Sequence, residues 1–151
     1  MNLTIRKAPE GPDYEQIAEL LIKFANEHEM GTLSAKTFDP VKAIPWIVEH
    51  VKCATWVVED VDKIVGSLGL RLATPWYSHQ EYYADGWFFV ASEYRNSHAG
   101  TMLLEEVKRF SAERKAPVII NLFTMDNPEL KAKLLQRKGF TMIGGTFAFG
   151  A

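Results

Sequence analysis

The sequence contains very little cysteine: Cys53 is the only one among 151 residues. A single thiol cannot form an internal disulfide, and no second cysteine or suitably spaced histidine accompanies it as a zinc ligand. The sequence therefore excludes a disulfide-stapled scaffold, and we expect no metal site. Because Cys53 opens the strand-like segment CATWVVED, we expect a buried, inert thiol rather than a nucleophile.

The sequence also lacks a charge excess and long apolar runs. Its formal net charge of -2 provides no basic surface for nucleic acid or anionic lipid. No apolar run approaches the roughly 20 residues of a membrane-spanning helix, and the segment MNLTIRKAPEG lacks the features of an export signal. We expect a cytoplasmic protein that binds neither nucleic acid nor membrane, and in which any anion is bound locally.

Apolar residues are plentiful, at 47%, and the length suits one domain spanning residues 1–151. The hydrophobic periodicity predicts the order β-α-α-β-β-β-α-β-α-β-β. Hairpins and crossovers alternate in this order, which indicates an α/β (α+β) fold with a partly antiparallel, partly parallel central sheet flanked by helices. The predicted strands are 3–8, 54–59, 64–74, a strand ending at 90, 117–123 and two short strands in 140–151, broken at Gly144 and Gly145.

The segment from Trp87 to Leu104 has the most informative local pattern. An apolar strand leads through a short polar loop into a helix, so the loop amides gather at the helix start. The first amides of a helix have no intrahelical partner and carry the positive end of the helix dipole. The segment therefore predicts a diphosphate site, and with it a nucleotide-containing cofactor.

Two segments resemble the GNAT superfamily of acyl-CoA-dependent N-acyltransferases. The motif of that superfamily is Arg or Gln, two residues, Gly, one residue, and Gly or Ala; here Arg95–Gly100 reads RNSHAG. Asn127–Phe140, NPELKAKLLQRKGF, looks like the superfamily's other recurrent segment of Asn, helix and closing GF. Its helix is also well delimited by a cap at Asn127, Pro128 in the first turn and Gly139 after the end.

The resemblance implies that acetyl-CoA is the cosubstrate. Its pantetheine arm would pair with backbone atoms of Phe88, Phe89 and Val90, in a gap that a β-bulge opens beside the strand. The Val90 amide would stabilise the oxyanion, and Asn127 would be a helix cap, a pantetheine contact or both. The pyrophosphate would bind the amides of Arg95, Asn96, Ser97, His98, Ala99, Gly100 and Thr101.

Two residues depart from the superfamily pattern. His98 stands in place of the first motif glycine, and we favour a side chain that points off the loop into solvent. Leu135 stands where many members carry the tyrosine that protonates the leaving thiolate. A thiolate is a fair leaving group without that acid, so transfer remains possible.

The acceptor amine arrives protonated and needs a base. Carboxylates near the start of the central strand, Asp85 and Glu81, are the candidates, although Asp85 also belongs to a DG turn signal. The loop containing Glu27, His28, Glu29 and Thr32 would face the acceptor. The aromatic residues Trp76, Tyr77, Tyr82, Tyr83 and Trp87 would line the acceptor pocket, pack in the core or form a subunit interface.

We therefore predict an acyltransferase that moves an acetyl group from acetyl-CoA to a primary amine of a small molecule or protein, as a possible homodimer. The alternative is a non-catalytic acyl-CoA-binding or interaction module of the same fold. A Rossmann-type nucleotide-binding domain is disfavoured, because APEGPD after the first strand is not the glycine-rich fingerprint.

Overall fold

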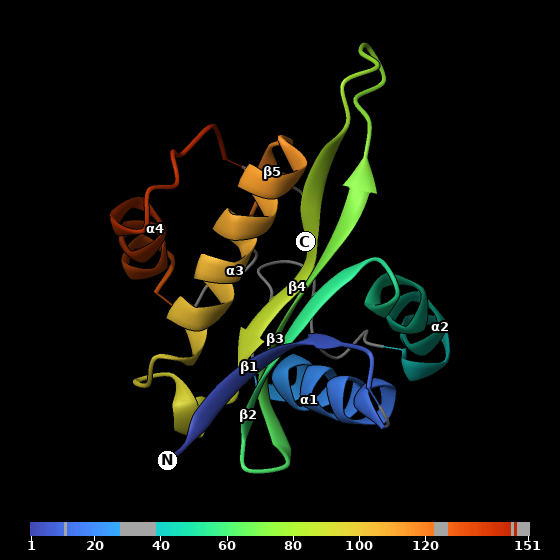
Figure 1. Ribbon diagram of the computed structural model, residues 1–151, viewed down its shortest axis with the longest axis vertical. Helices are drawn as coiled ribbons and strands as arrows, with labels where there is room; N and C mark the ends of the chain where they lie inside the picture. Colours follow the sequence, from blue (N-terminus) through green and yellow to red (C-terminus); the bar gives the residue numbers. More distant parts are fainter. Residues whose placement is uncertain (11, 28–38, 123–126, 146, 148–151) are drawn as a thin grey trace.

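The computed structural model describes residues 1–10, 12–27, 39–122, 127–145 and 147 (Figure 1). Asp39 caps the second helix, as its position before Pro40 predicts, by accepting a hydrogen bond from the Val41 amide. In chain order the elements are β1 (Leu3–Ala8), α1 (Asp13–Glu27), α2 (Pro40–Val51), β2 (Ala54–Asp60), β3 (Lys63–Ala73), β4 (Tyr82–Val90), the 3-10 helix η2 (Ser92–Tyr94), α3 (Ala99–Arg114), β5 (Val118–Ile119) and α4 (Pro128–Arg137).

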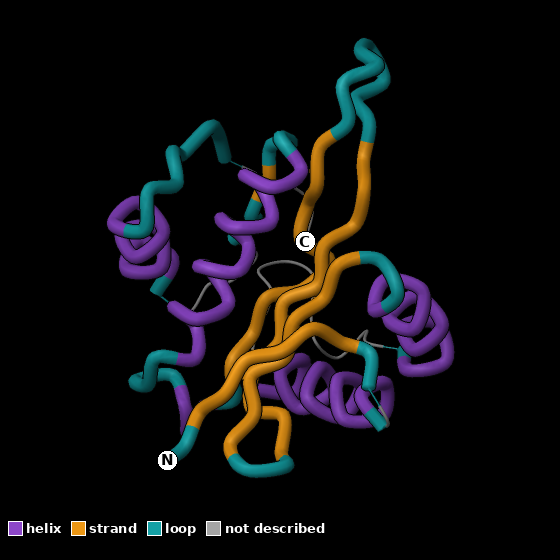
Figure 2. The backbone as a smooth tube through the Cα atoms, viewed as in Figure 1, coloured by secondary structure: helices purple, strands orange, loops and turns teal. Residues whose placement is uncertain are grey.

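The five strands form one sheet in the order β1-β2-β3-β4-β5. The first four strands pair antiparallel with their neighbours, and β5 pairs parallel with β4. This is the predicted mixed α/β architecture. The β3–β4 hairpin extends well beyond the body of the molecule (Figure 2).

Helices cover both faces of the sheet. On one face α1 and α2 pack against the sheet around Ile17, Ile47, Val57 and Trp87. On the other face lies α3, which buries Leu103, Leu104, Val107 and Phe110, residues spaced to form one side of a helix. Figure 1 shows α4 on the outer side of α3.

A charged network ties β1, α1 and β2 together. Arg6 donates to both carboxylate oxygens of Asp13 at 2.8 Å and to Glu59 at 2.7 Å. Asp13 is 1% exposed and also accepts from the Glu10 amide. Burial opposes the ionised form of Asp13, but the bonds from Arg6 and the Glu10 amide outweigh it and lower the pKa of Asp13.

The structure corrects three expectations. Residues 140–145 and 147 form no strand; the Phe140 amide bonds to Leu135 at the end of α4, while Met142, Ile143 and Phe147 are exposed. The strand predicted at 117–123 is limited to Val118–Ile119, among the residues the structure describes. Cys53 is exposed, because β2 begins only after it and Cys53 lies in the turn that follows α2.

Across the described ranges, no helix has the length and apolar character needed to cross a membrane.

Candidate active site

A gap opens between β4 and β5. Pairing between them covers only Tyr83 with Val118 and Ala84 with Ile119. From Asp85 onward, β4 has no strand beside it on that side within the described part of the chain. One side chain spans the opening: Oδ1 of Asp85 accepts from the backbone amide and the side-chain amide of Asn121, at 2.9 and 2.8 Å.

A β-bulge lies at the start of the gap. Asp85 pairs with Leu70 and Trp87 pairs with Gly69, so Gly86 is the extra residue on β4. A bulge bends its strand and increases the local twist. The predicted bulge in the strand before the loop is therefore present, next to Asp85.

The backbone of β4 beyond the bulge is open toward the gap. Ala91 donates to Val65 of β3, and hydrogen-bonded and non-hydrogen-bonded pairs alternate along antiparallel strands. Consequently the N–H and C=O groups of Phe88 and Val90 face away from β3, whereas those of Phe89 face Ser67. Phe88 and Val90 can each offer a donor and an acceptor to an extended ligand.

The loop before α3 presents free backbone donors. The amides of Arg95, Ser97 and Ala99 are bonded within the loop, to Ser92, Tyr94 and the Ser97 hydroxyl. Within the described residues, the amides of Asn96, His98, Gly100 and Thr101 make no hydrogen bond. Four open amides at a helix N-terminus fit a diphosphate.

The motif positions His98 and Gly100 are compatible with this role. His98 has a φ of -82°, so no left-handed backbone is required there, and its side chain is exposed, as the sequence favours. A Cβ on Gly100 would meet only Val90 at 3.9 Å and Phe88 at 4.0 Å. The protein alone thus leaves room at Gly100, which suits close approach of a ligand.

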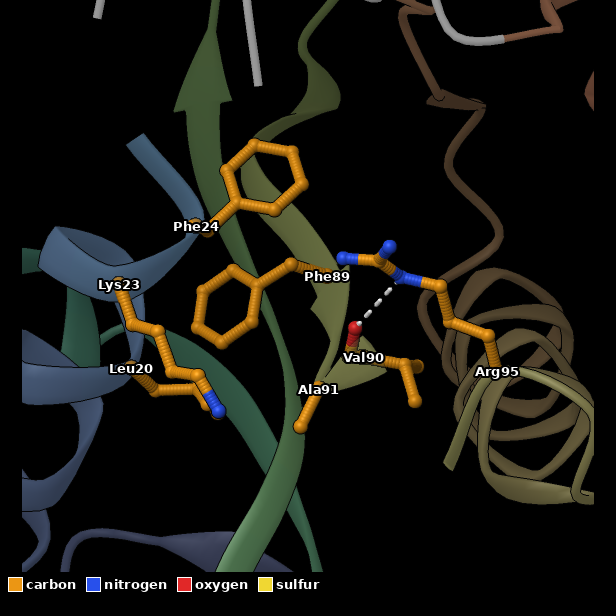
Figure 3. Close-up of a pocket in the computed structure, with 7 residues that line it drawn as sticks. All are labelled: Leu20, Lys23, Phe24, Phe89, Val90, Ala91 and Arg95. Carbon is orange, nitrogen blue, oxygen red and sulfur yellow. Dashed lines mark hydrogen bonds between the residues drawn. The ribbon is translucent and has the colours of Figure 1, made fainter. Parts of the chain in front are cut away.

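Arg95 lies across the open edge of β4. Its Nε donates to the Val90 carbonyl at 3.3 Å, beside a small pocket between α1 and the end of β4 (Figure 3). Leu20, Lys23, Phe24, Phe89 and Ala91 complete the pocket lining. The Arg95 guanidinium therefore lies at the edge of β4 that faces the gap, where it uses one of the two lone pairs of the Val90 carbonyl oxygen.

The carboxylates near the gap differ in environment. Burial raises the pKa of Asp85 above its ordinary value, and the bonds from Asn121 oppose the rise without cancelling it. Glu81 is exposed and lies about 13 Å before Asp85 along the strand direction. The pKa of Glu93 is lowered to about 2 by its own amide, by Lys23 at 3.0 Å and by Ser92, so Glu93 stays ionised.

The segment Asn127–Phe140 contains a helix cap and a buried leucine. Oδ1 of Asn127 accepts from the Leu130 amide at 3.4 Å, which confirms the cap. Leu135 is buried, so it offers an aliphatic surface and no proton.

The predicted aromatic cluster does not stay together. Trp76 and Tyr77 are 94% and 74% exposed at the tip of the hairpin, whereas Trp87 packs in the core and Tyr83 packs edge-on against Phe110. The expected acceptor loop, His28, Glu29 and Thr32, lies outside the described residues, as does the side chain of Glu27.

Sequence reasoning missed Trp46 and His50, whose rings stack at 3.4 Å beside the bulge. Their spacing on one helix is readable, but their position over Gly86 depends on the sheet register. Among the described residues, no three His, Cys, Asp or Glu side chains lie close enough to hold a metal ion.

A family model described as an acetyltransferase (GNAT) domain matches residues 52–142. This range contains the bulge, the open edge of β4, the loop before α3 and the helix that Asn127 caps. No curated protein matches the chain significantly.

Solved structures share the fold. A GCN5-related N-acetyltransferase from Ralstonia eutropha JMP134 superposes with a TM-score of 0.75 at 15% identity, covering 97% of each chain. A GNAT-family acetyltransferase from Streptococcus pneumoniae gives 0.74 at 16% identity, covering 99% of this chain and 93% of that one. AAC(6')-Iy, in complex with the bisubstrate analogue CoA-S-monomethyl-acetylneamine, gives 0.73 at 11% identity over 100% and 99%.

Proposed function

The chain belongs to the GNAT family of acetyltransferases and is an acyltransferase, and from this premise we propose that it transfers the acetyl group of acetyl-CoA to a primary amine. The acceptor is a small molecule or a protein amine. The observation that carries this proposal is the gap beside β4, where Asp85, the open groups of Phe88 and Val90, and the four free loop amides follow one another.

Each part has a distinct role. The amides of Asn96, His98, Gly100 and Thr101 bind the pyrophosphate, with Arg95 adding positive charge. The Phe88 carbonyl and the Val90 amide pair with the pantetheine amides. Bound acetyl-CoA supplies the thioester carbonyl that the amine attacks and the thiolate that leaves.

Asp85 accepts the proton that the acceptor ammonium must lose, directly or through water. A raised pKa suits this role, because it makes the carboxylate a stronger base. Since about 16 Å of strand separate Asp85 from Val90, the amide assigned to the thioester is that of Phe88, which faces the gap nearer to Asp85 and donates to the carbonyl oxygen as negative charge develops there. Since Leu135 carries no proton, the thiolate leaves as an anion and is protonated by solvent.

The test is a screen of primary amines, aminoglycosides included, for CoA release by the wild type and Asp85→Asn. A parallel thermal melt measures CoA binding, which stabilises the protein by about 2.7 kcal/mol at one hundred times Kd. Release with any amine that Asp85→Asn reduces supports the proposal. Binding without release across the panel points instead to a non-catalytic acyl-CoA-binding module, and absence of binding removes both.

A further inference from the structure

Trp46 of α2 is 40% exposed, yet its ring is held from several sides. It stacks on His50, with ring centroids 3.4 Å apart and planes 23° apart. Trp87 packs edge-on at 6.1 Å and is itself anchored by its Nε1, which donates to the Ser67 hydroxyl at 2.9 Å. Exposure of a single aromatic residue is ordinary, but a fixed ring at the surface is a preformed binding face.

The ring lies directly on the bulge. A Cβ built on Gly86 would be 2.4 Å from Cη2 of Trp46, far inside contact distance. The absence of a side chain at Gly86 is thus what admits the indole. Because Gly86 follows Asp85, the exposed indole contacts the stretch of β4 backbone that also carries the proposed base.

A hydrogen bond to the backbone of its own helix orients the His50 ring. Its Nδ1 lies 2.7 Å from the Trp46 carbonyl, which can only accept, so Nδ1 carries the proton. The imidazole is therefore tied to the same helical turn as the indole it supports. This arrangement limits the rotamers of both rings without a ligand present.

We propose that Trp46 determines acceptor specificity, and that its indole receives an ammonium group carried on an apolar ring or chain. This inference rests on the proposed function and names its acceptor class. An indole face attracts cations more strongly than any other side-chain ring, and its apolar surface suits a hydrocarbon frame.

The test measures binding without turnover. Protein saturated with CoA is titrated with cyclohexylamine, which is cationic at neutral pH, and with the neutral isostere cyclohexanol, by ligand-observed NMR. We expect Trp46→Leu to weaken cyclohexylamine binding about fivefold to thirtyfold, and Trp46→Phe to weaken it no more than about threefold. Wild type should bind the amine at least about fivefold more tightly than the alcohol.

The matched control is Ile44→Ala, which truncates an equally exposed side chain, at 41%, on the same helix. We expect it to leave cyclohexylamine binding unchanged. Equal affinity in Trp46→Leu and wild type, equal affinity for amine and alcohol, or no amine binding by the CoA-loaded wild type each overturns the inference. The amine–alcohol comparison needs no variant, so it holds even if Trp46→Leu does not fold. CoA binding and CoA release are measured separately, so failure of the proposed function is recognised independently.

Discussion

One oxygen atom of Asp85 accepts both the backbone and the side-chain amide of Asn121, at 2.9 and 2.8 Å, and so joins β4 to the chain after β5 where their pairing ends. Asp85 thus has two potential roles, as a base and as a tether between the separating strands. These roles can be separated by substitution, because an amide at position 85 keeps the accepting oxygen but cannot take up a proton.

Asp85→Asn should retain the fold and lose catalysis. We expect kcat to fall about 100-fold to 10,000-fold, the usual contribution of a general base. Steady-state CoA release measures the rate, and thermal melts with and without CoA check the fold and the cofactor site. Unchanged activity across the pH range would remove Asp85 from the mechanism and leave Glu81 as the candidate base.

The raised pKa of Asp85 also predicts a pH dependence of stability. A carboxyl whose pKa is higher in the folded than in the unfolded state stabilises the fold below the unfolded value of 3.8. That contribution is lost as the pH rises through the folded pKa. The stability of Asp85→Asn relative to wild type should therefore increase as the pH is raised from about 3 through this window, as urea titrations would measure. A constant difference would contradict the shift.

Asn121→Asp should shift the acidic side of the pH–rate profile to higher pH. A second carboxylate facing Asp85 disfavours ionisation and raises the pKa of Asp85 further, so activity should decline at a higher pH than in wild type. The control Asn121→Ala keeps the backbone bond and loses only the side-chain one, so it should raise the pKa of Asp85 less than Asn121→Asp does, at an expected cost of about 1 kcal/mol in stability. Identical pH profiles for Asn121→Asp and Asn121→Ala would refute the electrostatic argument.

Gly100→Ala should separate stability from cofactor binding. Without ligand, the added methyl group has room, and alanine is favoured over glycine in a helix by about 0.5–1 kcal/mol. We expect the free protein to melt at the same or a higher temperature, and CoA to bind at least tenfold more weakly. Calorimetric titration measures the affinity, and undiminished CoA affinity would show that the pyrophosphate does not approach this turn.

Asp13→Ala should be the most destabilising of these changes. Asp13 is buried, and its loss leaves Arg6 with Glu59 alone, at a cost of about 2 to 3 kcal/mol after allowing for the partial exposure of Arg6. Glu10→Ala is the control, because that carboxylate is 70% exposed and lies 3.7 Å from Arg6. Urea denaturation measures both, and equal values would refute the buried network.

Local signals explain what the sequence could predict. The end of β4, the loop and α3 follow one another along the chain, and Asn127, Pro128 and Gly139 delimit α4 by short-range backbone chemistry. The paired segments that became β2 and β3 needed only a turn between them. Each of these features depends on residues close in sequence.

Long-range register explains what the sequence could not predict. Asn121 approaches Asp85 because pairing between β4 and β5 stops one residue earlier, and Trp46 covers Gly86 because the bulge displaces that residue. The apolar segment that begins at Phe140 has the composition of a strand, yet the Phe140 amide donates a hydrogen bond to the Leu135 carbonyl at the end of α4. These outcomes depend on segments far apart in the chain.

The contact between Trp46 and Gly86 makes the two positions epistatic. With the indole in place, even a methyl group at position 86 would meet its ring atoms at 2.4 and 2.9 Å, so Gly86→Ala should be deleterious in the wild-type background. Removing the ring removes the obstacle, and the same substitution should then be tolerated. Trp46 should therefore be replaced before Gly86 whenever both positions are substituted. A change of the residue at the bulge should then be accompanied by a change of acceptor preference.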